Sequence, residues 1–191
     1  FLQDLEREIL ELGHELRAKT YRPRPYFTFK VYDPKERMIC AADFRDRVVH
    51  HAVCQIMAPI FEKHLIFDTY ACRPNKGPLK AVRHAQAHSR KFGYFLKLDI
   101  RKFFDSVDHA TLKAQLRRKV KDPDLLWLLD RFIDHPVPWT AEGKGLPIGN
   151  LTSQHFANFY LAGLDHMVST QAGVGGYLRY MDDLLLFSDH K

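Results

Sequence analysis

The hydrophobic pattern at the start of the chain is helical. Five apolar residues recur at three- and four-residue steps: Leu2, Leu5, Ile9, Leu12 and Leu16. This spacing predicts an amphipathic helix that runs to about residue 18. Pro23 and Pro25 then end it, because proline lacks the N–H that a helix interior needs.

Short runs of aromatic and branched residues predict strands. Residues 26–32 and 37–42 flank an Asp-Pro-Lys-Glu turn, which predicts a hairpin. Residues 94–100 form an apolar run that is typical of a single strand. Near the end of the chain, two aspartates join two further apolar runs at 177–181 and 184–188, and these are expected to be paired strands.

Further helices are expected between these strands. Asp43 is placed to cap a helix that continues to about Phe61, and Asp108 is placed to cap another. The other helical stretches are residues 79–90, 110–120, 123–132 and 152–168, with Gly- and Pro-rich loops at 71–79 and 143–149. The pattern therefore predicts a mixed α/β (α+β) fold in which helices come early and strands return late.

Length and composition exclude several classes of protein. The 191 residues suit one domain or two small ones, and 46% apolar residues exclude a disordered chain. The longest apolar runs, such as 184–187, are too short to span a bilayer. Phe1 is not an initiator methionine, so we expect a piece excised from a longer protein. Three cysteines without a zinc-type spacing indicate reduced thiols and a cytoplasmic location.

Positive charge is concentrated in two segments of the chain. The whole chain carries 29 Lys and Arg against 23 Asp and Glu, a net charge of +6. Nine basic and four acidic residues give residues 17–47 a local charge of +5, and nine against one give residues 73–102 a charge of +8. Two basic segments on an otherwise acidic body indicate a surface for phosphates, although a basic segment is more often a solvated face.

Two adjacent carboxylates, Asp182 and Asp183, join the last two predicted strands. Hairpin turns prefer Asn-Gly or Asp-Gly, and neighbouring aspartates repel each other. The pair is either a plain solvated turn or a site where a divalent cation offsets the charge. Asp99 ends the strand at 94–100, 83 residues earlier, which leaves enough chain to return alongside it. Three such carboxylates can bridge two Mg²⁺ ions about 3.5–4 Å apart, as in phosphoryl transfer.

Three segments resemble the motifs of reverse transcriptases. Residues 95–105 (Phe-Leu-Lys-Leu-Asp-Ile-Arg-Lys-Phe-Phe-Asp) are similar to motif A, and Tyr-Met-Asp-Asp at 180–183 is similar to motif C. Residues 145–154 (Gly-Leu-Pro-Ile-Gly-Asn-Leu-Thr-Ser-Gln) stand where these enzymes carry motif B. Ile148 and Gln154 replace the Gln and Pro of most group II intron and retron enzymes. This pattern resembles the reverse transcriptases of diversity-generating retroelements.

The resemblance, which begins near residue 26, implies the fingers and palm of a right-hand polymerase. It places the N-terminal helix and fingers in residues 1–90 and the palm with motifs A, B and C in residues 91–191, with the two parts interleaved. It also implies that the palm is truncated after motif C and that the thumb is absent. We therefore expect residues 1–191 alone to be inactive or weak and to expose apolar surface that further palm would cover.

The resemblance also implies roles for individual residues. Asp99, Asp182 and Asp183 would be catalytic and hold two Mg²⁺ ions, for which Mn²⁺ can substitute, and Ile100 would add its backbone carbonyl. Residues implied in nucleotide binding are Lys30, Arg37, Phe104, Ile148, Gly149 and Asn150. Residues implied in template and primer binding are Arg45, Arg47, Arg73, Lys76, Lys80, Tyr180 and Met181. Phe104 stands where the family excludes a ribose 2′-OH, and a core phenylalanine is the alternative there.

The implied function is an RNA-directed DNA polymerase that copies a template RNA into cDNA with errors. Its partners would be template RNA, cDNA, a dNTP and an accessory protein of the retroelement. The protein would be bacterial or phage-encoded and cytoplasmic, and no membrane would be involved. Two alternatives stay open: a group II intron-like or retron-like reverse transcriptase, and a polymerase fold kept only as an RNA-binding module. The eleven histidines are expected to be structural or solvated.

Overall fold

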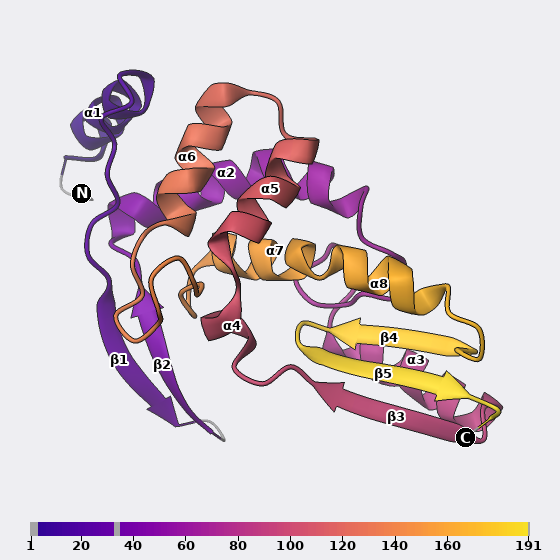
Figure 1. Ribbon diagram of the computed structural model, residues 1–191. Helices are drawn as coiled ribbons and strands as arrows, with labels where there is room; N and C mark the ends of the chain where they lie inside the picture. The colour runs from indigo at the N-terminus through magenta and orange to yellow at the C-terminus, as the bar shows by residue number, and fades with distance from the viewer. Residues whose placement is uncertain (1–3, 33–34, 191) are drawn as a thin grey trace.

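The computed structural model describes residues 4–32 and 35–190 and contains two separate sheets. The antiparallel ribbon of β1 (Phe27–Tyr32) and β2 (Glu36–Ala41) stands apart from a three-stranded sheet, with α4 between them (Figure 1). That sheet has the order β3-β5-β4 and consists of β3 (Tyr94–Asp99), β4 (Gly176–Tyr180) and β5 (Asp183–Ser188). The helices are α1 (Leu5–Arg17), α2 (Phe44–Glu62), α3 (Pro78–Lys91), α4 (Phe103–Ser106), α5 (His109–Lys119), α6 (Pro123–Ile133), α7 (Leu151–Tyr160) and α8 (Ala162–Ser169).

The predicted elements are confirmed with two differences. Asp43 and Asp108 cap their helices as expected, accepting hydrogen bonds from the backbone N–H groups of Arg45 and Thr111. The short helix α4 was not predicted. The single helix expected over 152–168 is two helices, because the chain leaves regular geometry at Leu161.

Side chains from other elements accompany the break between α7 and α8. Gln115 Nε2 donates to the carbonyl of Tyr160 at 3.2 Å, and Arg179 Nη2 donates to the carbonyl of Asn158 at 3.1 Å. Both carbonyls lie in the last turn of α7, where a continuous helix would bond them within itself. The break therefore depends on tertiary contacts that the hydrophobic pattern does not encode.

The main core lies among the helices, where α2 packs along α7. His50 of α2 belongs to this interior: its Nδ1 lies 2.7 Å from Thr152 Oγ1 and its ring stacks on Phe132. Burial lowers the pKa of His50 to about 4, so the ring is neutral, as expected for a structural histidine. Buried apolar side chains of this core are Val49, Val53, Met57, Phe61, Leu112, Leu116, Leu129, Phe132, Ile133, Phe156, Ala157 and Phe159.

The apolar strand β3 is exposed along its whole length. It is an edge strand, and α3 and α8 pack against β4 and β5. Phe95 is 69% exposed and Leu96 is 53% exposed. Among the described residues, none of the helices has the length and apolar character needed to cross a bilayer.

The β1–β2 ribbon is attached to the motif B loop at one point. Cys40 N donates to the carbonyl of Ile148 at 2.7 Å. The next residue, Gly149, has φ +117°, and a Cβ placed on it would lie 2.8 Å from Ile39 Cγ2 and 3.0 Å from the carbonyl of Cys40. Glycine at 149 therefore permits the close approach of the loop to β2, since any side chain would strain the backbone and push the strand away.

We predict that Gly149→Ala loosens this attachment. The added methyl group meets β2 and also disfavours the positive φ, so the free energy of unfolding should fall by about 1–3 kcal/mol in urea titrations. The matched control is Gly163→Ala in α8, where an added Cβ has nothing within 4 Å. Equal stability of both variants would contradict the close-packing argument.

Candidate active site

The pairing of β3 with β5 brings the predicted carboxylates to one end of the sheet. Asp99 is directly opposite Asp183 in the antiparallel register, and cross-strand neighbours have Cβ atoms about 4.5–5.5 Å apart. Asp182 lies in the turn before β5, and its carbonyl accepts a hydrogen bond from Ile100 N at 3.2 Å. All four residues that the sequence assigned to metal binding are therefore neighbours in space.

The three carboxylates act on one another electrostatically. Asp182 is half-buried, and burial raises the pKa of its carboxyl above the usual range. The charges of Asp99 and Asp183 raise that pKa further, whereas Arg37 lowers it. Lys97 Nζ lies 3.3 Å from Asp183 Oδ1 and offsets part of the charge.

This set of residues fits divalent magnesium by its chemistry. Mg²⁺ prefers hard oxygen ligands and is usually held by one or two carboxylates plus substrate phosphates and water. Within residues 4–32 and 35–190, no three His, Cys, Asp or Glu side chains already converge closely enough to enclose an ion. Asp99, Asp182 and Asp183 therefore suit an open site completed by substrate, with the Ile100 carbonyl beside them.

The two cations predicted to bind triphosphate project differently from the β1–β2 ribbon. Val31 is the cross-strand partner of Arg37, so Lys30 lies on the opposite face of the ribbon from Arg37. Lys30 Nζ pairs with Glu36 Oε1 at 2.6 Å. The charge of Arg37 lowers the pKa of Asp182, and the end of β3 and the β4–β5 turn point toward the ribbon (Figure 1).

The motif B loop connects the ribbon, α4 and α7. Leu146 N donates to the carbonyl of Phe104 at 2.7 Å, two residues before Ile148 bonds to β2. Phe104 is half-buried, while Phe103 is a core residue at 3% exposure. Asn150 is 3% exposed, and its Nδ2 has no hydrogen-bond partner among the described residues.

The basic residues predicted to meet template differ in how far they are engaged within the protein. Arg45 is buried and pairs with Glu15, whereas Arg47 is exposed. Lys76 Nζ donates to the carbonyl of Phe67 and Lys80 Nζ to that of Asn75, both at 2.7 Å.

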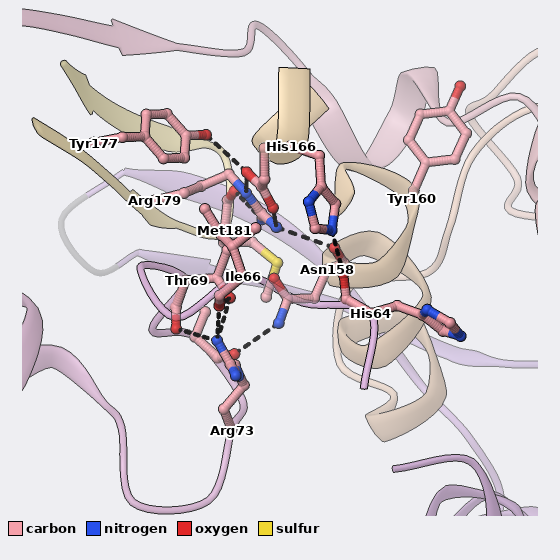
Figure 2. Close-up of polar contacts among 12 residues, drawn as sticks. His64, Ile66, Thr69, Arg73, Asn158, Tyr160, His166, Tyr177, Arg179 and Met181 are labelled. Atoms are coloured by element: carbon pink, nitrogen blue, oxygen red, sulfur yellow. Dashed lines mark hydrogen bonds and ion pairs between the residues drawn. The ribbon is translucent and has the colours of Figure 1, made fainter. Parts of the chain in front are cut away.

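Arg73 organises its own loop. Its guanidinium donates to the carbonyl of Ile66 and to both oxygens of Thr69 (Figure 2). It also donates to the carboxylate of Glu62. The Arg73 side chain is only 6% exposed, so its contacts are with this loop. Lys76 and Lys80 also bond backbone carbonyls of the same loop.

A buried ion pair next to the candidate site was not predicted. Arg179 and Asp165 are both fully buried, with Nε–Oδ1 and Nη2–Oδ2 distances of 2.6 Å. Tyr177 donates its hydroxyl to Asp165 Oδ1 at 2.7 Å, so two β4 residues converge on one α8 carboxylate (Figure 2). In sequence, Arg179 stands beside the Tyr-Met-Asp-Asp motif within an apolar run, and a charge at a predicted core position is the one signal that marks it.

The mixed α/β fold, with three aspartates clustered at one end of the three-stranded sheet, is consistent with the fingers and palm of the right-hand polymerase fold. The family model described as "Reverse transcriptase (RNA-dependent DNA polymerase)" matches residues 30–191. This chain therefore belongs to the reverse transcriptase family, whose members use divalent metal ions.

Curated relatives include a protein encoded by a group II intron. The group II intron-encoded protein LtrA of Lactococcus lactis subsp. cremoris is 28% identical over 173 residues, covering 85% of this chain and 28% of that protein. Protein YkfC of Escherichia coli is 28% identical over 172 residues, covering 83% of this chain and 44% of that protein. The chain thus spans well under two thirds of the length of these relatives.

Solved structures share the fold at low sequence identity. Apo telomerase from Candida tropicalis superposes with a TM-score of 0.65 at 11% identity, covering 96% of this chain and 49% of that chain. A partial Cas6-RT-Cas1–Cas2 complex superposes with a TM-score of 0.57 at 18% identity, covering 96% and 33% of the two chains. The mixed α/β architecture predicted from the sequence is confirmed.

We predict that Asp182→Asn stabilises the metal-free protein at neutral pH. Because the folded state raises the pKa of Asp182, its ionised form lowers stability at neutral pH, and this loss disappears as pH falls to the unfolded value near 4. With EDTA at pH 7, the melting temperature of the variant should rise by roughly 2 °C, and the gain should vanish near pH 4.

The control for this comparison is Asp189→Asn, at an exposed position. It should leave the melting temperature unchanged at both pH values. A lower melting temperature for Asp182→Asn in EDTA would show that its carboxylate is favourably paired in the folded protein.

Proposed function

We propose that this chain forms the fingers and catalytic palm of an RNA-directed DNA polymerase. The enzyme would extend a primer along a template RNA, adding dNTPs to build cDNA. The observation that carries the proposal is the cross-strand pairing of Asp99 with Asp183 beside Asp182, in a chain of the reverse transcriptase family. Two carboxylate-bearing strand ends at one site suit two-metal nucleotidyl transfer.

The carboxylates would act by holding metal ions at the place where the phosphate groups react. Asp99, Asp182 and Asp183, with the Ile100 carbonyl, would hold two Mg²⁺ ions, for which Mn²⁺ can substitute. Bound ions would supply activation of the primer 3′-OH and neutralisation of the developing charge on the triphosphate. The protein's own contribution is to hold these oxygens at one end of a hydrogen-bonded sheet, so that little reorganisation accompanies the reaction.

The incoming nucleotide would lie between the ribbon and the motif B loop. Arg37, whose charge lowers the pKa of Asp182, offers a planar fork of donors that suits phosphate. Lys30 would reach the triphosphate only by leaving Glu36. The unpartnered, buried Nδ2 of Asn150 is a donor that a nucleotide acceptor would satisfy. Phe104 would exclude a ribose 2′-OH. Ile148 and Gly149 would line the remaining side of the nucleotide-binding site.

Template and primer would lie along the basic segments and the catalytic turn. Arg47 and Lys80 are exposed and suit direct phosphate contacts. Arg45, Arg73 and Lys76 would act mainly by shaping the loops that carry such contacts. Tyr180 and Met181 flank the carboxylates and would meet the primer end. The partners proposed are template RNA, cDNA and an accessory protein. The protein would be bacterial or phage-encoded and would act in the cytoplasm.

Two observations favour different subtypes. Ile148 and Gln154 in motif B resemble the enzymes of diversity-generating retroelements, which supports error-prone copying. The similarity to group II intron-encoded LtrA favours an intron-type enzyme as the second candidate. Ile148 offers apolar contact where most relatives offer an amide, and a site without a polar group to leave unpaired discriminates less well between bases.

The activity is tested by Mg²⁺-dependent primer extension on an RNA template with the complete natural protein. Asp182→Ala should lower the rate of primer extension by about 1,000-fold or more, because it removes a metal ligand. Asp189→Asn is the matched control at an exposed aspartate and should extend normally. Wild-type protein that binds RNA tightly, ignores chelator and extends no primer would be an RNA-binding module instead.

The subtype is tested at Ile148. Wild-type product should carry errors concentrated opposite template adenine, and Ile148→Gln should lower them by about 10-fold if the amide restores a discriminating hydrogen bond. Sequencing of cDNA made from an adenine-rich template measures both values. A low error rate spread evenly over the wild-type product would favour the intron-type enzyme. An unchanged error rate in Ile148→Gln would show that Ile148 does not determine fidelity.

A further inference from the structure

The turn that carries the catalytic aspartates has an unfavourable local conformation. Tyr180 and Asp183 form the last cross-strand pair of β4 and β5, so Met181 and Asp182 make a two-residue turn. Met181 has φ +56°, in the left-handed region. Hairpins favour Gly, Asn or Asp at such positions, and a methionine in this region is strained. Surrounding structure must therefore hold the turn.

Arg179 makes the side-chain contact that holds it. Its Nη1 donates to the carbonyl of Met181 at 2.8 Å, so the guanidinium reaches past the end of β4 and bonds the turn itself (Figure 2). The same guanidinium is anchored behind the sheet, on Asp165 of α8 and on the carbonyl of Asn158 of α7. The turn is thus joined through one side chain to both central helices.

The backbone of Arg179 is fixed as well. Its N–H donates to the carbonyl of Asp68 at 2.9 Å, and its carbonyl accepts from Tyr70 N at 3.0 Å. Asn158 Nδ2 donates to the carbonyl of Ala71 at 2.9 Å, which ties the same loop to α7. A guanidinium with its backbone, its carboxylate partner and its second acceptor all held in place is a rigid support.

We propose that Arg179 is a positioning residue for catalysis, which sets the catalytic turn by bonding the carbonyl of Met181 from the Asp165 anchor. This inference rests on the proposed polymerase function of the same site. Arg179 touches no reacting group. It holds the turn in the conformation from which Asp182 and Asp183 face Asp99.

Because Arg179 is fully buried, its positive charge requires the carboxylate of Asp165 as a partner. An arginine can be placed where no water reaches only with a partner carboxylate, and removing one partner of such a pair is strongly destabilising. A hydrophobic residue at position 179 would pack against the helices equally well, but it would offer no donor to the carbonyl of Met181. The donor, which only the buried pair provides, is therefore the functional part of the arrangement.

Arg179→Lys tests the proposal in the complete natural protein. Lysine keeps the charge for Asp165 and lacks the planar fork that reaches Met181 at the same time. At a temperature where circular dichroism shows a folded protein, the kcat of primer extension should fall about 100-fold, because small misplacement of catalytic groups has effects of this size. The KM for dNTP should stay near the wild-type value, and amide hydrogen exchange in residues 180–184 should accelerate.

Tyr177→Phe is the matched control. It removes a buried hydrogen bond to the same carboxylate but leaves the bond to the turn. It should lower the melting temperature and leave kcat and exchange of the turn unchanged. Asp165→Asn is the second variant, since it keeps the arginine and weakens its anchor. It should shift kcat and exchange in the same direction as Arg179→Lys and by less, and it decides the question if Arg179→Lys does not fold.

The outcomes separate this proposal from the proposed function. A folded Arg179→Lys or Asp165→Asn protein with wild-type kcat and wild-type exchange of the turn overturns the positioning role, leaving only a contribution to stability. A wild-type protein that extends no primer overturns the polymerase function instead. The exchange measurement still reports in that case whether Arg179 holds the turn.

Discussion

Mutual repulsion among three carboxylates is the constraint to which the rest of this molecule is fitted. Asp99, Asp182 and Asp183 gather at one end of a sheet although each charge opposes the others, and burial makes the ionised form of Asp182 still less favourable. The β3–β5 pairing holds the first and last of them opposite each other. Lys97 and Arg37 supply partial compensation from the strand and from the ribbon. The groups that would act on substrate therefore lower the stability of the fold that presents them.

Most elements were predictable because their causes are local. Helix caps at Asp43 and Asp108, the proline-bounded first helix and the alternating strands of the ribbon follow from side-chain chemistry within a few residues. The three carboxylates were also predictable, since Asp99 closes one apolar strand and Asp182 and Asp183 lie at the junction of two others. Their proximity needed the added inference that the strand ending at Asp99 pairs with the strand that starts at Asp183.

The features that escaped prediction depend on residues distant in sequence. The break at Leu161 accompanies donors from Gln115 and Arg179, which no periodicity in residues 152–168 encodes. A charge within an apolar run marks Arg179 in the sequence, but nothing there identifies Asp165 as its partner, because the pair forms only through the packing of α8 on β4. The exposure of β3 was likewise hidden, because apolar composition tells how a strand suits an interior and says nothing of its place at the edge of a sheet.

The exposed edge of β3 has a consequence for how the protein behaves in bulk. An edge strand presents unpaired backbone donors and acceptors, and here it also carries Tyr94, Phe95, Leu96 and Leu98 with 44–69% of their surface open. Lys97 is the one charged side chain in the middle of that strand and is paired with Asp183. Lys97 is thus the charge that opposes edge-to-edge self-association at this strand, and salt that screens it would favour such association.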